Sequence, residues 1–303
     1  MRFTWLSCLL LASCSLVKPT PSEPARDTHQ IPAAEKSIKA GPSTLDLAFA
    51  KPGGVELLLD LHLPDGVENP PLVMAIHGGG WQRGNRKSYP LLWLTRYGYA
   101  VAAIEYRLSH EAVFPAQIHD CKGALRWLRA HQNDFAYDAD KVVAIGMSAG
   151  GHLACLMGTT GGVASLEGST AGHAGQSSEV QGVINYFGPS DFVLRAESQP
   201  AITDSPKGIV YRLLGGSVSA NLESARLASP VTHCDPEDAP LLIIHGGSDP
   251  QVLPSQSERL LEVCRANQME AHLHIEAGKK HGWSPATSTE QKLVLDFLKK
   301  HLR

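Results

Sequence analysis

The chain has 303 residues, of which 43% are hydrophobic and 19% charged, and its 27 Lys and Arg residues nearly balance its 30 Asp and Glu residues. This composition is ordinary for a globular protein, and the balanced charge gives no electrostatic signature of a nucleic-acid or anionic-lipid partner. The length suits one large α/β domain, and no internal segment approaches the roughly 20 apolar residues of a membrane-spanning helix.

The N-terminus is typical of an exported protein. Within residues 1–17, one Arg precedes an apolar run that is too short to span a bilayer but suits a signal peptide. The tetrapeptide Leu11-Ala12-Ser13-Cys14 resembles the bacterial lipobox, where cleavage leaves a lipidated N-terminal cysteine. We therefore expect a membrane-anchored lipoprotein, periplasmic or associated with the outer membrane, with Cys14 as the lipidated residue and ordinary secretion as the alternative. Residues 18–42, rich in Pro, Ser, Thr and Ala, are predicted to be a disordered linker.

Residues 43–303 are predicted to form the folded domain, because strand and helix patterns alternate along them. Strands are expected at 45–50, 55–63, 72–76, 99–106, 142–145, 180–187, 241–244 and 271–276, and helices at 115–131, at 255–267 and in a C-terminal segment ending near Leu302. The first two strands should form an antiparallel hairpin at one edge of the sheet. The alternation predicts a mainly parallel sheet flanked by helices.

Two segments lack a clear strand pattern. Residues 158–178 are rich in Gly, Ser, Thr and Ala and are expected to be a surface loop. Residues 192–228 carry scattered apolar residues, and they form either a small helical lid over the active-site mouth or an ordinary helical crossover.

A serine stands on a predicted sharp turn after the strand at 142–145. The sequence Gly146-Met147-Ser148-Ala149-Gly150 matches G-x-S-x-G, a strand-to-helix turn that exposes a serine hydroxyl. A non-catalytic Gly/Ser turn that lets a helix pack close to a sheet would have the same sequence pattern. The other motifs of the chain must therefore distinguish a catalytic serine from a structural one. The context favours Ser148 as a nucleophile.

A glycine run provides the second part of the predicted site. In His77-Gly78-Gly79-Gly80-Trp81, which follows an apolar strand, the backbone N–H groups of Gly79 and Gly80 are expected to form an oxyanion hole with that of Ala149. Trp81 either walls the acyl or leaving group or packs under the loop.

A serine hydroxyl needs an imidazole to take its proton and a carboxylate to orient that imidazole. Asp249 and His281 follow the last two strands, and the order Ser148, Asp249, His281 is the one found in α/β-hydrolases. All three lie at the carboxyl ends of strands, where open α/β sheets bind ligands. Of the rivals, His77 is expected to brace the glycine loop and Asp191 to be structural.

The six cysteines are too few and too scattered for a disulfide scaffold or a zinc site. Cys121, Cys155, Cys234 and Cys264 are expected to be small buried hydrophobes, although an exported protein would permit pairing. We expect no metal and no nucleotide cofactor, because the chain has neither clustered Cys and His residues nor a phosphate-binding loop.

From about Leu45 to its end, the chain resembles the α/β-hydrolase superfamily, and within it the branch of bifunctional feruloyl and acetyl esterases related to hormone-sensitive lipase. The matching segments are HGGGW (77–81), EYRL (105–108), FPAQIHDCKGALRWLR (114–129), GMSAGGH (146–152), YFGPSDF (186–192), SPVTH (229–233), LLIIHGGSDPQVLP (241–254) and HGW (281–283). Ser109-His110-Glu111 departs from the hormone-sensitive-lipase pattern and favours the feruloyl and acetyl esterase branch. The loop after Asp249 is one residue longer than the common Asp-x-x-Val-Pro.

The resemblance implies the same roles for Ser148, Asp249, His281 and the oxyanion donors. It implies a cofactor-free serine esterase whose substrates are small-molecule or carbohydrate esters with short acyl or aryl groups, including acetyl or feruloyl groups on plant or algal polysaccharide. Two alternatives stay open. A peptidase or amide hydrolase would use the same triad, and a binding lipoprotein would keep the scaffold without catalysis.

Overall fold

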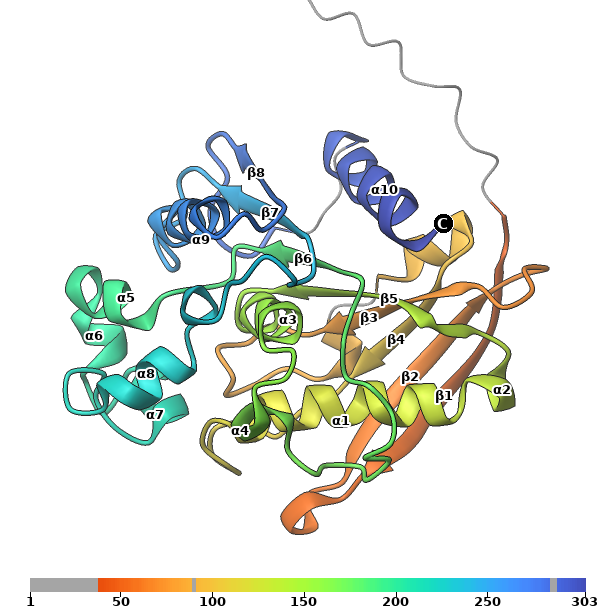
Figure 1. Ribbon diagram of the computed structural model, residues 1–303, viewed down its shortest axis with the longest axis horizontal. Helices are drawn as coiled ribbons and strands as arrows, with labels where there is room; N and C mark the ends of the chain where they lie inside the picture. The colour runs from red at the N-terminus through yellow and green to blue at the C-terminus, as the bar shows by residue number, and fades with distance from the viewer. Residues whose placement is uncertain (1–37, 89–90, 284–287) are drawn as a thin grey trace, which may run out of the picture. The chain divides into compact units, whose positions relative to one another are not determined.

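The computed structural model describes residues 38–88, 91–283 and 288–303, so the predicted signal peptide, Cys14 and most of the linker lie outside it. Within these residues, eight strands form one sheet in the order β1-β2-β4-β3-β5-β6-β7-β8 (Figure 1). The strands are β1 (Ala40–Ala50), β2 (Leu57–Pro64), β3 (Pro71–Ile76), β4 (Ala100–Ile104), β5 (Asp138–Met147), β6 (Gly182–Tyr186), β7 (Leu241–Gly246) and β8 (Ala271–Glu276). The predicted edge hairpin is confirmed: β1 and β2 pair antiparallel, β2 joins β4 antiparallel, and all other pairs are parallel.

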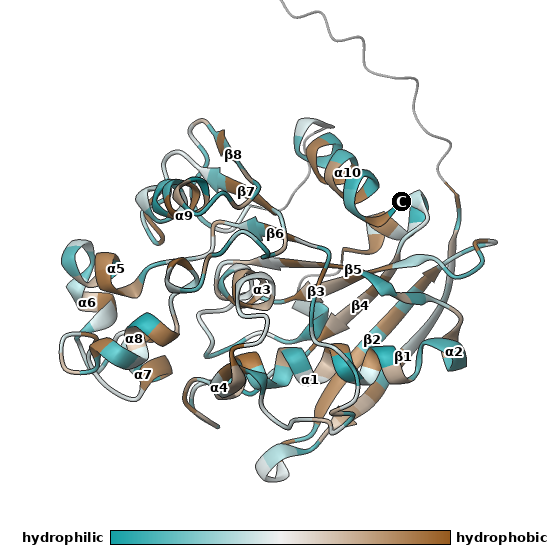
Figure 2. Ribbon diagram, viewed as in Figure 1, coloured by the Kyte–Doolittle hydropathy of each residue, from teal (hydrophilic) through white to brown (hydrophobic). Residues whose placement is uncertain are grey.

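The central strands are apolar on both faces because helices cover both. In β3, Leu72, Met74 and Ile76 belong to one core cluster, whereas Val73 and Ala75 belong to the other. Side chains alternate between the faces of a strand, so a continuous apolar run is what a doubly covered strand requires. The brown colour of β3 and β4 in Figure 2 reflects this pattern.

Helices line both faces of the sheet and the carboxyl ends of its strands. They are α1 (Ala116–Ala130), α2 (Gln132–Phe135), α3 (Ala149–Thr159), α4 (Ala164–Glu167), α5 (Phe192–Ser198), α6 (Pro200–Thr203), α7 (Ile209–Leu214), α8 (Leu222–Leu227), α9 (Ser255–Ala266) and α10 (Ser288–Leu302), with 3₁₀ turns at Pro52–Gly54, Arg86–Ser88, Leu92–Tyr97 and Pro230–Thr232. Residues of α1, α3 and α9 share one core cluster, and residues of α10 and of the turn Leu92–Tyr97 share the other. The helices predicted at 115–131, 255–267 and the C-terminus are confirmed.

The predicted linker boundary was wrong by a few residues. Strand β1 begins at Ala40, which pairs with Pro64 of β2, so residues 40–42 belong to the sheet. The Gly and Pro content of this segment predicted a loop. Pro42 is tolerated because β1 is an edge strand. In an edge strand, every second backbone N–H group points away from the sheet and forms no hydrogen bond with another strand, so a proline there costs no ladder hydrogen bond.

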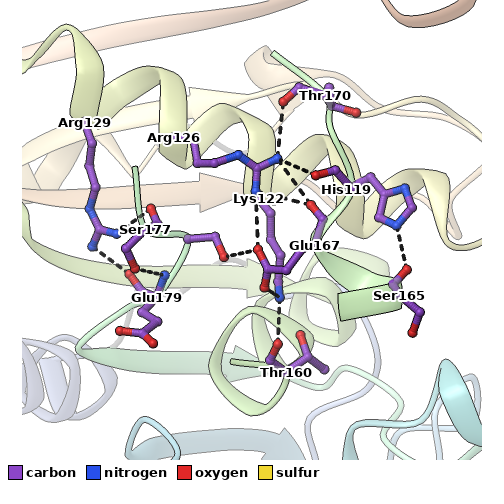
Figure 3. A network of polar contacts seen from close by, with 12 residues as sticks. His119, Lys122, Arg126, Arg129, Thr160, Ser165, Glu167, Thr170, Ser177 and Glu179 are labelled. Carbon is purple, nitrogen blue, oxygen red and sulfur yellow. Dashed lines mark hydrogen bonds and ion pairs between the residues drawn. The ribbon is translucent and has the colours of Figure 1, made fainter. Parts of the chain in front are cut away.

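The segment predicted as a surface loop at 158–178 is fastened by buried cations of α1 (Figure 3). Lys122 Nζ donates to Thr160 O (2.7 Å) and pairs with the Glu167 carboxylate on α4. Arg129 Nη2 donates to Glu179 O (2.7 Å), one residue past the end of the segment. Burial lowers the pKa of Lys122, and the Glu167 carboxylate opposes that shift.

We predict that Glu167→Gln destabilises the fold by about 3 kcal/mol, because it leaves Lys122, whose side chain is 1% exposed, without a counter-charge. Urea denaturation followed by tryptophan fluorescence measures the free energy of unfolding. Asp296→Asn is the matched control, since it breaks an ion pair with Lys292 that is exposed on both sides and is worth less than about 1 kcal/mol. Equal effects of the two substitutions would contradict the structural role of Glu167.

Candidate active site

Ser148 stands at the turn from β5 to α3 in a backbone conformation that few residues adopt. Its φ is 52° and its ψ is −118°, and its N–H donates to Tyr186 O at 2.8 Å. A Cβ atom added at Gly146 would lie 2.1 Å from Gly150 O, and one added at Gly150 would lie 2.1 Å from Ile76 O. Both flanking positions therefore require glycine, as the G-x-S-x-G turn predicts.

The three residues predicted as a triad meet at one hydrogen-bonded chain. His281 Nε2 lies 2.9 Å from Ser148 Oγ, and His281 Nδ1 lies 2.6 Å from Asp249 Oδ2. Because the carboxylate accepts a hydrogen bond, Nδ1 carries the proton and Nε2 is free to accept the one on the serine hydroxyl. The geometry is that of a nucleophile, a general base and an orienting acid.

The Asp249 carboxylate is buried yet remains ionised. Burial alone would raise its pKa, but hydrogen bonds from His245, His281 and the Val252 N–H together hold the pKa below its ordinary value. Oδ1 accepts from the N–H groups of Gln251 (2.9 Å) and Val252 (3.0 Å). The longer loop after the acid thus wraps around the carboxylate.

His245 is a functional residue whose role the sequence did not disclose, although it sits in the same His-Gly-Gly-Ser-Asp segment as the acid. It is fully buried; its Nδ1 lies 2.6 Å from Ser257 Oγ, and its Nε2 lies 2.9 Å from Val252 O and 3.5 Å from Asp249 Oδ2. The Val252 carbonyl can only accept, so Nε2 carries the proton, and in that tautomer the Ser257 hydroxyl donates to Nδ1. His245 therefore positions the acid loop against α9.

The glycine loop after β3 presents unpaired backbone donors to the site. Gly79 and Gly80 have φ angles of 113° and 63°, and a Cβ atom at Gly79 would lie 2.0 Å from Arg83 O. Among the described residues, neither N–H group has a protein acceptor. Ala149 begins α3, where first-turn N–H groups lack an intrahelical partner. Gly79 and Gly80 line the same cleft as Ser148, Ala149 follows Ser148 directly, and no described residue accepts from the two glycine N–H groups.

His77 braces this loop, as predicted. Its Nδ1 donates to Gly78 O (2.8 Å), and its ring stacks on Tyr106 with centroids 4.3 Å apart. The Tyr106 hydroxyl donates to His77 O at 2.9 Å. Burial lowers the pKa of His77 to about 4, so the ring is neutral. Asp191 is structural, as predicted: it caps α5 by accepting from Leu194 N–H at 2.9 Å.

Two hollows of unequal size meet at Ser148 and His281. A small cavity of about 90 Å³ is walled by Trp81, Pro189, Val252 and the two isoleucines Ile202 and Ile209. A larger open cleft of about 670 Å³ runs along the glycine loop. Because the isoleucines come from α6 and α7, the helices within 192–228 cover the site, which favours the lid over an ordinary crossover.

Trp81 combines the two roles considered for it. It lines the small cavity, and it is 1% exposed, with its ring edge-on to His152 and Phe192 at centroid distances of 5.2 and 5.8 Å. Cys121, Cys155, Cys234 and Cys264 are buried free thiols, as expected of small hydrophobes.

No group of three or more His, Cys, Asp or Glu side chains is arranged as a metal site in the part of the chain that the structure covers. In the same part, no helix combines the length and the apolarity that crossing a membrane requires.

Comparison with known proteins identifies the fold and then the family. A truncated carbohydrate esterase from gut microbiota superposes with a TM-score of 0.79 and 27% identity, covering 88% of this chain and 98% of that one. A bifunctional GH43-CE protein of Bacteroides eggerthii superposes with a TM-score of 0.78 and 31% identity, covering 86% of this chain and 38% of that one. The predicted α/β-hydrolase fold is confirmed.

The BD-FAE family model matches residues 59–263, and the chain belongs to this family.

Curated relatives agree with this placement. The probable carboxylic ester hydrolase LipM of Mycobacterium tuberculosis is 30% identical over 203 residues, which are 64% of this chain and 45% of LipM. The esterase LipQ of the same organism is 29% identical over 228 residues, 73% of this chain and 52% of LipQ. The chain spans about half the length of the curated relatives that it matches.

We predict that Asp249→Asn slows the reaction of Ser148 with a fluorophosphonate probe by about 10⁴-fold, because an amide neither fixes the His281 tautomer nor stabilises the imidazolium. Gel fluorescence over time measures the labelling rate. Asp191→Asn is the matched control, since it changes a carboxylate that caps α5 without touching His281. Equal labelling rates for the two variants would refute Asp249 as the acid.

Proposed function

We propose that this protein is a serine esterase that hydrolyses esters through a covalent acyl-enzyme. The observation that carries the proposal is the hydrogen-bonded chain from Asp249 through His281 to Ser148, beside unpaired N–H groups at the mouth of a cavity. The similarity to LipM, a probable carboxylic ester hydrolase, and to the esterase LipQ supports ester rather than amide hydrolysis.

In the proposed mechanism, Ser148 Oγ attacks the ester carbonyl carbon while its proton passes to His281 Nε2. The oxyanion that forms accepts hydrogen bonds from the N–H groups of Gly79, Gly80 and Ala149, and each such donor contributes about 3 kcal/mol to transition-state stabilisation. Collapse of the intermediate expels the alcohol, which takes the proton from His281. Water then attacks the acyl-enzyme by the same route, and Asp249 stays ionised throughout.

The small size of one of the two hollows at Ser148 supports a preference for substrates with a short acyl group. A cavity of about 90 Å³ holds the volume of about three water molecules, which suits an acetyl or propionyl group but not a feruloyl group. The alcohol then occupies the cleft of about 670 Å³, where a sugar fits. The structural likeness to a carbohydrate esterase supports an acetylated carbohydrate as the substrate.

The chain from residue 18 onward should hydrolyse p-nitrophenyl acetate faster than the butyrate, and methyl ferulate most slowly. Ser148→Ala should lose the activity by about 10⁶-fold in kcat, because the remaining groups cannot form an acyl-enzyme. Nitrophenolate release and chromatography of ferulate give the rates. Equal rates for wild type and Ser148→Ala would end the proposal, and a preference for ferulate would overturn the assignment of the small cavity.

We also propose that the mature protein is exported and anchored by lipid at Cys14. The lipobox-like Leu11-Ala12-Ser13-Cys14 supports this proposal, and these residues lie outside the described part of the chain. Intact-mass spectrometry of membrane fractions should find residues 1–13 absent and acyl mass on Cys14. A soluble protein with an unmodified N-terminus would refute the anchor and favour ordinary secretion.

A further inference from the structure

A second hollow lies beside the catalytic cleft, and one side chain lines both. Gln82 follows the glycine loop, and its N–H donates to Gly79 O at 3.2 Å. It lines the cleft of about 670 Å³ that contains Ser148 and also a neighbouring hollow of about 510 Å³. Tyr211 and Arg212 of α7 line this second hollow as well. A substrate larger than one sugar would extend from the first hollow into the second.

The walls of these two hollows carry positive charge and no negative charge. Arg83 lines the cleft and Arg212 the second hollow, whereas no Asp or Glu lines either among the described residues. Glu111, next in the chain to the lining residue His110, lines neither hollow, and its Oε2 accepts from Leu108 N–H at 2.7 Å. This local charge is opposite to that of the whole chain, which is −3.

Neither arginine is paired with a carboxylate in the part of the chain that the structure describes. Among the described residues, no carboxylate lies within ion-pair distance of Arg83 or Arg212. Arg212 donates to neutral oxygens, from Nη1 to Gln82 Oε1 at 3.3 Å and from Nε to Pro206 O at 3.4 Å. Both side chains are exposed. Arg83 and the Nη2 group of Arg212 therefore keep N–H donors for an incoming carboxylate or sulfate group.

Polar groups without partners mark the same walls. Gln82 Nε2 and Ser109 Oγ are shielded from solvent and have no hydrogen-bond partner among the described residues. Both residues line the second hollow, next to Tyr211. This wall therefore carries neutral polar side chains beside Arg212.

We propose that the enzyme selects acetylated carbohydrates that carry an anionic group, a uronate carboxylate or a sulfate, close to the scissile ester. The inference rests on the proposed esterase function and deepens it. The acetyl group enters the small cavity and the acetylated sugar lies in the cleft. The anionic substituent on that sugar or its neighbour lies between Arg83 and Arg212.

The test compares three substrates of equal length: an acetylated neutral xylo-oligosaccharide, one bearing a glucuronate branch, and a sulfated one. Acetate release gives kcat/KM for each. The wild type should prefer at least one anionic substrate over the neutral one, and the preference should shrink as sodium chloride screens the exposed charges. The anionic substrate that is preferred identifies the recognised group.

Arg212→Gln and Arg83→Gln should each lower the ratio of anionic to neutral kcat/KM about 5-fold, the size expected for an exposed charge contact. Arg212→Lys should retain part of the preference. Arg226→Gln is the matched control, because Arg226 is an exposed arginine of α8 in the same helical lid but lines neither hollow. Its ratio should stay at the wild-type value.

Equal kcat/KM for anionic and neutral substrates would overturn the inference and leave the esterase intact. A preference that Arg226→Gln lowers as much as Arg212→Gln would also overturn it, since the charge effect would then not be local. Failure of the wild type to cleave p-nitrophenyl acetate or any of the oligosaccharides, with no fluorophosphonate labelling of Ser148, would instead overturn the proposed function.

Discussion

The hydrogen bond of 2.6 Å between His281 Nδ1 and Asp249 Oδ2 is the contact on which the site depends. It requires an ionised carboxylate in a buried position, which the protein achieves by directing several donors at one side chain. It also requires two loops to meet, and the sheet ensures this because β7 and β8 are parallel neighbours with Gly246 opposite Glu276. The acid and the base follow these paired ends and therefore arrive at the same edge.

The position of Ser148 depends on the absence of side chains at neighbouring glycines as well as on hydrogen bonds. A Cβ atom at Gly78 would lie 2.8 Å from Met147 O, so the glycine loop and the serine turn touch through bare backbone. Side chains at these positions would separate the oxyanion donors from Ser148. The strained φ of the serine costs free energy that the packed strand and helix on either side offset.

Much of this architecture could be predicted from the sequence because the governing signals are local. Strand β8 was predicted at its observed bounds, and α1 to within one residue, since apolar runs and helical periodicity act over a few positions. The lid was harder: α5 to α8 have 4 to 7 residues each, too few to show a period. The roles of His245 and Gln82 depend on contacts between segments that are distant in the sequence, such as the contact between Gln82 and Arg212. No local sequence pattern predicts such contacts.

Two arginines that lie three residues apart, Arg83 and Arg86, differ in burial and in ion pairing, and the difference distinguishes a structural role from a binding role. The Arg86 side chain is 8% exposed and contacts three carboxylates, those of Asp46, Asp60 and Glu105, because a buried guanidinium without counter-charges would destabilise the fold. Arg83 stands three residues earlier in an open cleft, where water solvates its charge and the fold gains little from a partner. A carboxylate beside it would add at most a little stability and would occupy the donors that an anionic substrate needs. Among the described residues Arg83 therefore has no ion-pair partner at little structural cost, which leaves its donors for the proposed binding role.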